Sequence, residues 1–237
     1  MTSILEDVLA AHGGRRWQEL TSITATRRFG GALWGLKQVP GVAEHGRFTI
    51  DVQQEHSSLA SFGADDLRTD FTPERVAILR GEEVVEELLD PRASFAGHEL
   101  TTPWSRLQLA YFTGYAMWTY NSEPWSFTLP GVQVGEPEPW REGEETWSRF
   151  TVAYPPSFAT HSPVQRLYAD RDGILRRRDY EVDIAGGSPA VEYMTGQVEV
   201  DGIVLPTERS IYVRDEHGHP VNEPLIVSIH IDDIVLD

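Results

Sequence analysis

The stretch TPWSRLQLAYFTGYAMWTY, Thr102 to Tyr120, decides how this chain folds. Ser105, two residues after Pro103, is a favourable helix N-cap, and no breaker interrupts the segment after it. We therefore predict a helix over residues 105–120. Gly114 disfavours this helix by about 1 kcal/mol relative to alanine. A residue without a side chain at this position would let another element approach closely.

Aromatic and other apolar side chains occupy most faces of this predicted helix. Tyr111, Tyr115 and Trp118 fall at helical spacing and share one face. Further apolar positions, Phe112, Ala116 and Tyr120, widen that surface. A helix that is apolar on most sides is buried, so we expect this segment to lie inside the fold.

Outside this helix the chain alternates with the period of β-strands. Phe48, Ile50 and Val52 alternate with polar residues, and similar short strands are predicted at 21–29, 58–63, 75–80 and 83–88. The second half is nearly all strand, with hairpin signals at 172–173, 201–202 and 216–219. We expect a mainly β fold with one helix before the sheet and another in its middle. A single antiparallel sheet of about ten or eleven strands would curve strongly into an unclosed barrel, with the helix as lid or plug.

Composition excludes several functional classes. The formal charge of −17 disfavours a nucleic-acid partner, because binding phosphates requires a basic surface. The chain has no cysteine, which removes disulfides and thiolate metal sites. Neither a signal peptide nor a membrane span is evident, so the expected location is the cytoplasm unless a leader has been removed. No nucleotide, metal or hydrolase motif is present, and we expect no cofactor and no metal.

Several segments carry a resemblance to a known group of proteins. They are AHGG followed by Trp17 and Leu20, then TSITATRRF, YADRDGILRRRDYEV and VEVDGIVLPTERSIYV. In this order they resemble the LolA/LolB-like superfamily, whose name comes from outer-membrane lipoprotein sorting. RTDFTPER, DPRASFAGHELTTPW and GYAMWTY are similar to an uncharacterised bacterial group with that label. The resemblance implies one domain over residues 1–237, an unclosed barrel with a helical lid over an apolar cavity.

The chain departs from the exported members of that superfamily. Periplasmic lipoprotein carriers have a leader, and the lipoprotein receptor has an acylated cysteine after its leader; this sequence shows neither. The same fold also serves at least one cytoplasmic enzyme of pigment biosynthesis. The resemblance therefore implies the fold and leaves carrier and enzyme both open.

Two interpretations of the aromatic helix follow. In one, its side chains only fill the core. In the other, they line a pocket for an apolar or aromatic small molecule, because a buried tyrosine hydroxyl needs a partner that leucine would not. The candidate binding residues on or beside the helix are Trp104, Tyr111, Tyr115, Trp118 and Tyr120.

Candidate catalytic groups are the histidines His98 and His161. His98 lies in the loop before the helix, and His161 lies at the entry to a strand. Either is able to exchange protons near neutral pH, but the pattern of each favours an ordinary surface or loop histidine.

A third candidate region is the strand LRRRDYEV. Arg176, Arg178 and Tyr180 share one face of it. If that face points inward, two arginines enter the barrel and require compensation, which indicates either an internal ion-pair network or an anion-binding spot.

Together these features predict a protein that holds an apolar or aromatic small molecule between the sheet and helix 105–120. It either only binds that molecule or converts it as a cofactor-free isomerase, lyase or cyclase with histidine and tyrosine acid–base groups. A lipid or lipoprotein carrier, or an interaction protein, is the further alternative. The sequence leaves the oligomeric state open.

Overall fold

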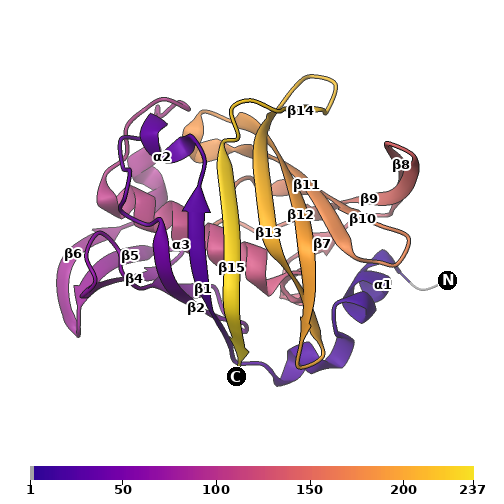
Figure 1. The fold of residues 1–237 in the computed structure, drawn as a ribbon, viewed down its shortest axis with the longest axis horizontal. Coiled ribbons are helices and arrows are strands. Elements are labelled where there is room, and N and C mark those ends of the chain that lie inside the picture. The colour runs from indigo at the N-terminus through magenta and orange to yellow at the C-terminus, as the bar shows by residue number, and fades with distance from the viewer. Residues whose placement is uncertain (1–2) are drawn as a thin grey trace.

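The computed structural model describes residues 3–237, and its main feature is one antiparallel sheet of fifteen strands. Along the sheet the order is β6-β5-β4-β3-β2-β1-β15-β13-β12-β11-β10-β9-β7, with β14 on β13 and β8 on β9. β6 and β7 end the order and do not pair with each other, so the barrel is not closed. Most neighbours are joined by hairpins, but β15 inserts between β1 and β13 and so ties the two halves of the chain together (Figure 1).

The elements have the following bounds. The helices are α1 (Ile4–Ala11), α2 (Leu33–Leu36) and α3 (Arg106–Ser122), with short 3-10 helices at Gly14–Glu19, Pro91–Phe95, Trp125–Thr128 and Asp183–Ala185. The strands are β1 (Ser22–Gly30), β2 (His45–Asp51), β3 (His56–Leu59), β4 (Leu67–Thr72), β5 (Arg75–Arg80), β6 (Glu83–Leu89), β7 (Gln133–Val134), β8 (Glu138–Glu142), β9 (Glu145–Ala153), β10 (Val164–Ala169), β11 (Leu175–Val182), β12 (Ser188–Val200), β13 (Ile203–Arg214), β14 (Pro220–Val221) and β15 (Val227–Leu236).

The predicted fold class is confirmed, a curved antiparallel sheet with a buried helix. The three hairpin turns predicted in the second half are also present, between β10 and β11, β12 and β13, and β13 and β14. The sheet contains more strands than the ten or eleven expected. Two of the additional strands, β7 and β14, have only two residues each and lack a detectable alternation. β4 was not predicted, and the predicted strand 58–63 ends earlier, as β3.

Helix α3 lies on the concave side of the sheet and crosses its strands (Figure 1). Ser105 caps it through a reciprocal capping box with Gln108. The helix packs against β2 to β6, and Gly114 is the closest point of approach: a Cβ there would lie 2.5 Å from Cγ of Phe71 on β4. The carbonyl of Gly114 accepts a hydrogen bond from Ser57 on β3 at 3.0 Å. The absence of a side chain at 114 thus sets how deeply α3 sits in the sheet.

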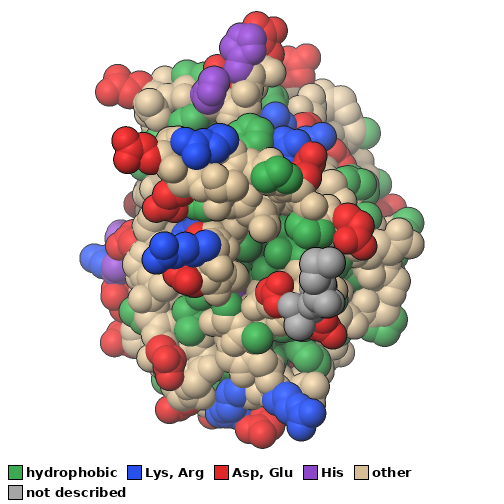
Figure 2. Space-filling view, turned by 90° about the vertical axis from the view of Figure 1, so that its right-hand side faces the viewer, with side chains coloured by type: hydrophobic (Ala, Val, Ile, Leu, Met, Phe, Trp, Pro, Cys, Tyr) green, Lys and Arg blue, Asp and Glu red, His purple; other side chains and the backbone are tan. Residues whose placement is uncertain are grey.

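Helix α1 covers the other end of the sheet. Val8 is fully buried in a second apolar cluster with residues of β9 to β12. His12, the C-cap residue, joins α1 to the sheet, since its Nδ1 contacts the carbonyl of Val204 at 2.9 Å and its Nε2 accepts from the Leu175 amide at 3.1 Å. Figure 2 looks onto the side of the molecule where α1 and β8 lie, and shows apolar side chains near the middle of that face with acidic side chains scattered around them.

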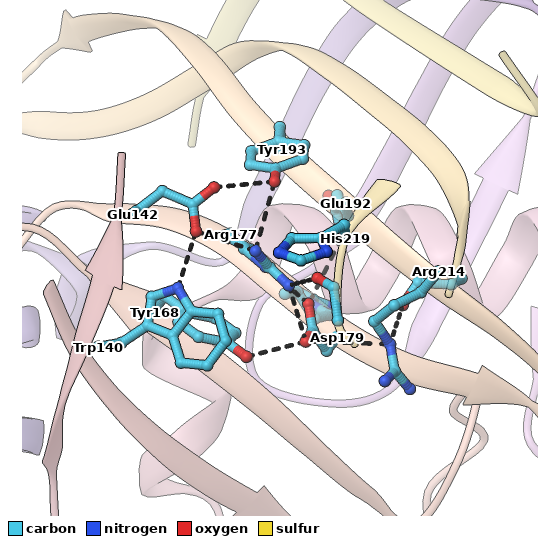
Figure 3. Close-up of polar contacts among 12 residues, drawn as sticks. Trp140, Glu142, Tyr168, Arg177, Asp179, Glu192, Tyr193, Arg214 and His219 are labelled. Atoms are coloured by element: carbon cyan, nitrogen blue, oxygen red, sulfur yellow. Dashed lines mark hydrogen bonds and ion pairs between the residues drawn. The ribbon is translucent and has the colours of Figure 1, made fainter. Parts of the chain in front are cut away.

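The outer face of β11 carries a dense polar cluster around Arg177 (Figure 3). Its guanidinium pairs with Asp179 at 2.8 Å and with Glu142 of β8 at 2.9 Å. Glu142 also accepts a hydrogen bond from Tyr193 of β12 at 2.9 Å, and Asp179 accepts one from Tyr168 of β10 at 2.8 Å. These contacts attach the β8–β9 hairpin to the outer face of the sheet. This structural role accounts for the cluster.

Candidate functional site

An apolar pocket lies between α3 and the half of the sheet against which α3 packs less closely. Its walls come from β1, β11, β12, β13 and β15 on one side and from the second face of α3 on the other. α2 and the 100–104 segment close one end through Leu33, Trp34 and Trp104. Phe29 of β1 stacks on Trp34 of α2 with ring centroids 5.6 Å apart, and this contact holds α2 against the sheet.

The pocket is almost wholly hydrophobic and narrow. Its empty space is about 690 Å³ with the mouth included, of which about 50 Å³ has room for the centre of a water molecule. From the sheet the lining includes Phe29, Val182, Ala190, Ile211, Val213, Val227 and Ile229. From α3 it includes Phe112, Thr113, Ala116, Met117 and Tyr120. The Thr113 hydroxyl bonds to carbonyls of its own helix, at 2.9 Å to Leu109, so it is not a free polar anchor.

His161 lies at the floor of this pocket at the centre of a hydrogen-bonded chain. Its Nδ1 is 3.0 Å from the Tyr115 hydroxyl and its Nε2 is 2.8 Å from the Tyr120 hydroxyl. Tyr120 in turn contacts the Tyr180 hydroxyl at 2.9 Å, and the Tyr180 ring stacks on the imidazole at 4.3 Å. Both ring nitrogens are therefore occupied by phenols, and neither is free to face a ligand.

Burial keeps the hydrogen-bonded side chains around His161 uncharged. Desolvation is the main cause that lowers the pKa of His161 well below 6.5, and the cations Arg178 and Arg92 lower it further. Desolvation likewise raises the pKa of the phenols Tyr115 and Tyr120 well above 10. A neutral imidazole has one donor and one acceptor nitrogen, which matches one accepting and one donating tyrosine. These hydrogen-bonded side chains can relay a proton, but they offer no base near neutral pH.

The burial of His161 predicts an acid-sensitive fold. Below pH 6.5 an unfolded chain protonates this histidine whereas the folded protein does not, so folding stability falls as pH decreases. One such proton contributes a slope of at most about 1.4 kcal/mol per pH unit. We expect His161→Gln, which can donate and accept without titrating, to lose stability less steeply below pH 6.5 than the native protein.

Urea unfolding at pH 7, 6 and 5 measures this difference. The matched control is His217→Gln in the exposed 216–219 turn, which should keep the native slope. Equal slopes for the native protein and His161→Gln would show that His161 is not held neutral in the fold.

Behind Tyr120 lies a buried network of two carboxylates and two guanidiniums. Arg178 pairs with Glu123, and its Nε is 3.4 Å from Glu192, which pairs with Arg209 at 2.5 Å. The Tyr120 ring lies between the two guanidiniums, 4.8 Å from Arg178 and 4.7 Å from Arg209. Burial raises the pKa of Glu123 to about 7, with the two arginines acting in the opposite direction. The network supports the pocket floor from behind.

The structure brings four of the predicted site residues to the pocket wall, namely Trp104, Tyr120, His161 and Tyr180. The others lie elsewhere. Tyr115 and Trp118 pack in the core, where Trp118 stacks on Phe158 and donates to the Asp51 carbonyl at 2.8 Å. Tyr111 lines a separate hollow, and His98 contacts the Phe95 ring. Arg178 points inward and lies in an internal ion-pair network, whereas Arg176 on the same strand face is one third exposed and pairs with Asp170. A role in binding or catalysis stays a prediction for each of these residues.

On the face of α3 that forms the pocket, sequence reasoning named only Tyr120 as a binding residue. Phe112, Ala116 and Tyr120 line it, whereas the Tyr111, Tyr115 and Trp118 face packs away from it. It also missed Glu123, Glu192 and Arg209, which are far apart in sequence and meet only in the fold. The alternation of Val227, Ile229 and Ile231 in β15 was visible, and the first two of these residues do line the pocket.

Residues 3–237 were compared with the requirements of metal clusters and of membrane-spanning helices. No group of three or more histidine or acidic side chains in this part of the chain is arranged to hold a metal ion. None of the described helices combines the length and the apolar character needed to cross a bilayer.

Comparison of the fold with solved structures finds similar proteins. A LolA superfamily protein from Nitrosomonas europaea has a TM-score of 0.52 at 11% identity, covering 99% of this chain and 92% of that one. A DUF1329 family protein from Desulfovibrio piger has a TM-score of 0.55 at 9% identity, with coverage of 99% and 92%. A domain from Vibrio parahaemolyticus, provisionally described as an outer-membrane lipoprotein-sorting protein, has a TM-score of 0.55 at 8% identity, with coverage of 99% and 91%.

No protein-family description and no curated protein matches the sequence. At these identities the structural likeness establishes a LolA-like fold and nothing about activity.

Proposed function

We propose that this protein binds an apolar small molecule in the pocket between α3 and strands β1, β11, β12, β13 and β15, without converting it. The main observation behind the proposal is the composition of the pocket wall. It is apolar on nearly every side, and the polar groups at its floor are already paired with one another. A pocket of this composition binds by apolar burial and places few demands on ligand orientation.

The non-catalytic reading is favoured over an isomerase, lyase or cyclase by the state of His161. A general base must have a nitrogen within hydrogen-bond reach of its substrate and a pKa near the working pH. Both nitrogens of His161 contact tyrosines, and burial lowers its pKa well below 6.5. The structural neighbours named for lipoprotein sorting fit a carrier as well. The narrowness of the pocket implies that its walls move apart when a ligand enters.

Native mass spectrometry followed by organic-solvent extraction tests the proposal. Gently purified protein should carry a stoichiometric apolar compound, or should bind the neutral dye Nile red after extraction with one site per chain. Empty protein that also fails to bind Nile red would reject a ligand pocket. A compound that is chemically altered during incubation with the protein would instead support the enzyme reading.

A further inference from the structure

A groove on the far side of α3 from the apolar pocket combines a buried carboxylate with open space. Two hollows share Pro73, Glu74, Ser157 and Phe158 and so form one continuous groove, which we call the 157 groove. Their empty volumes, with the open mouths included, are about 610 Å³ and about 720 Å³. Each hollow is therefore similar in size to the apolar pocket.

Glu55 is the unusual residue of this groove. It lies in the turn between β2 and β3, lines one of the hollows and is only 8% exposed. Its Oε2 accepts a hydrogen bond from the Ala159 amide at 3.0 Å, whereas its Oε1 has no partner among the described residues. A buried carboxylate oxygen without a partner is costly, so a donor is missing from this site.

The surrounding charges are those of a site for a cation. Glu74 and Asp90 line the groove as well, and neither forms an ion pair within residues 3–237. Arg92 is the cation of the groove, and its charge is matched by Asp183 at 2.9 Å. None of the three carboxylates forms an ion pair among residues 3–237, although Arg92 lies near enough to attract Glu55. Phe158 adds an aromatic wall, which favours an organic cation.

We propose that the 157 groove binds an organic ammonium group, with Glu55 as its buried anchor and Glu74 at the rim. A metal ion fits less well, because these carboxylates do not form a cluster arranged for metal binding. Oε1 of Glu55 is itself covered, so the ammonium group reaches it through a small displacement of residues 157–159. The strongly acidic chain attracts cations generally, and the experiment must separate that attraction from a specific site.

The charges around Glu55 give the site a pH dependence. Burial raises the pKa of Glu55 well above 4.5; Glu74 adds to this and Arg92 opposes it, while Tyr111 is the remaining titratable group nearby. A cation binds the ionised carboxylate, so affinity should increase as the pH rises through the raised pKa of Glu55. The same change of pH should have little effect when residue 55 is glutamine.

Titration with benzylammonium, followed by NMR or calorimetry, tests the proposal. We expect saturable binding to the native protein and about tenfold weaker binding to Glu55→Gln. Glu199→Gln removes the same charge from the exposed far end of β12 and should bind as the native protein does. Benzyl alcohol, which has the same ring without the charge, should not compete.

A second variant keeps the test valid if Glu55→Gln does not fold. Glu74→Gln changes an exposed rim residue and should weaken benzylammonium binding about threefold. Thermal unfolding reports whether each variant is folded, and unchanged Nile red binding shows that the apolar pocket is intact. The proposal is overturned if the native protein does not bind benzylammonium at millimolar concentration, or if neither groove variant weakens binding more than Glu199→Gln does. It would then be a water molecule that satisfies Glu55.

Discussion

Replacing Arg178 by methionine should destabilise the protein by about 3–5 kcal/mol, the range for breaking a buried ion pair from one side. Arg178 is fully buried and contacts both Glu123 and Glu192. Its removal leaves two buried carboxylates facing Arg209 alone. Methionine keeps most of the side-chain volume, so the loss of stability measures the effect of the missing charge and not that of a cavity.

The expected loss depends on pH. Because the pKa of Glu123 is about 7 in the native protein, this carboxyl can take up a proton when its cation is removed. The deficit of Arg178→Met should therefore be smaller at pH 5.5 than at pH 8, and Glu123→Gln in the same chain should restore part of the stability.

Denaturant unfolding of Arg176→Met provides the control for this prediction. Arg176 lies two residues away on the same strand, but it is one third exposed and pairs with Asp170 near the surface at 2.7 Å. Pairs of that kind contribute at most about 1 kcal/mol. Equal losses for the two variants would mean that the internal network contributes no more than a surface pair.

Replacing Ala116 by phenylalanine should weaken binding of Nile red, or of a co-purified compound, by about 100-fold, which corresponds to about 2.7 kcal/mol. Ala116 lies on the pocket face of α3, opposite the β-strands of the far wall. Only about 50 Å³ of the pocket has room for the centre of a water molecule. A benzyl group at this position therefore fills the space that a ligand needs. The added bulk also costs about 1–3 kcal/mol of stability by overpacking.

Ala153→Phe is the matched control, because Ala153 lies on β9 outside the pocket lining. It should bind the dye as the native protein does. Fluorescence titration gives the two affinities, and thermal unfolding confirms that both variants are folded. Undiminished binding by a folded Ala116→Phe would place the ligand site elsewhere and remove the basis of the proposed function.

The sequence by itself determined the elements whose signals are local. The capping position of Ser105, the uninterrupted apolar run after it and the hairpin turns all depend on neighbouring residues. The helix and the antiparallel sheet followed from those signals, as did the shared strand face of Arg178 and Tyr180, but not the direction in which that face points. β4 was missed because its buried alternation, in Leu67, Thr69 and Phe71, includes a threonine and is followed closely by the Pro73 turn.

The tertiary structure alone decided which face of α3 became pocket. The Tyr111, Tyr115 and Trp118 face and the Phe112, Ala116 and Tyr120 face are both aromatic, and helical periodicity cannot distinguish between them. Close packing at Gly114 against Phe71 sets α3 into the β2–β6 half of the sheet, so the opposite face is left toward the other half. The pairing of His161 with three tyrosines, and the meeting of Glu123, Arg178, Glu192 and Arg209, likewise join residues far apart in the chain. Contacts of that range depend on how the sheet curves, and no local pattern in the sequence encodes them.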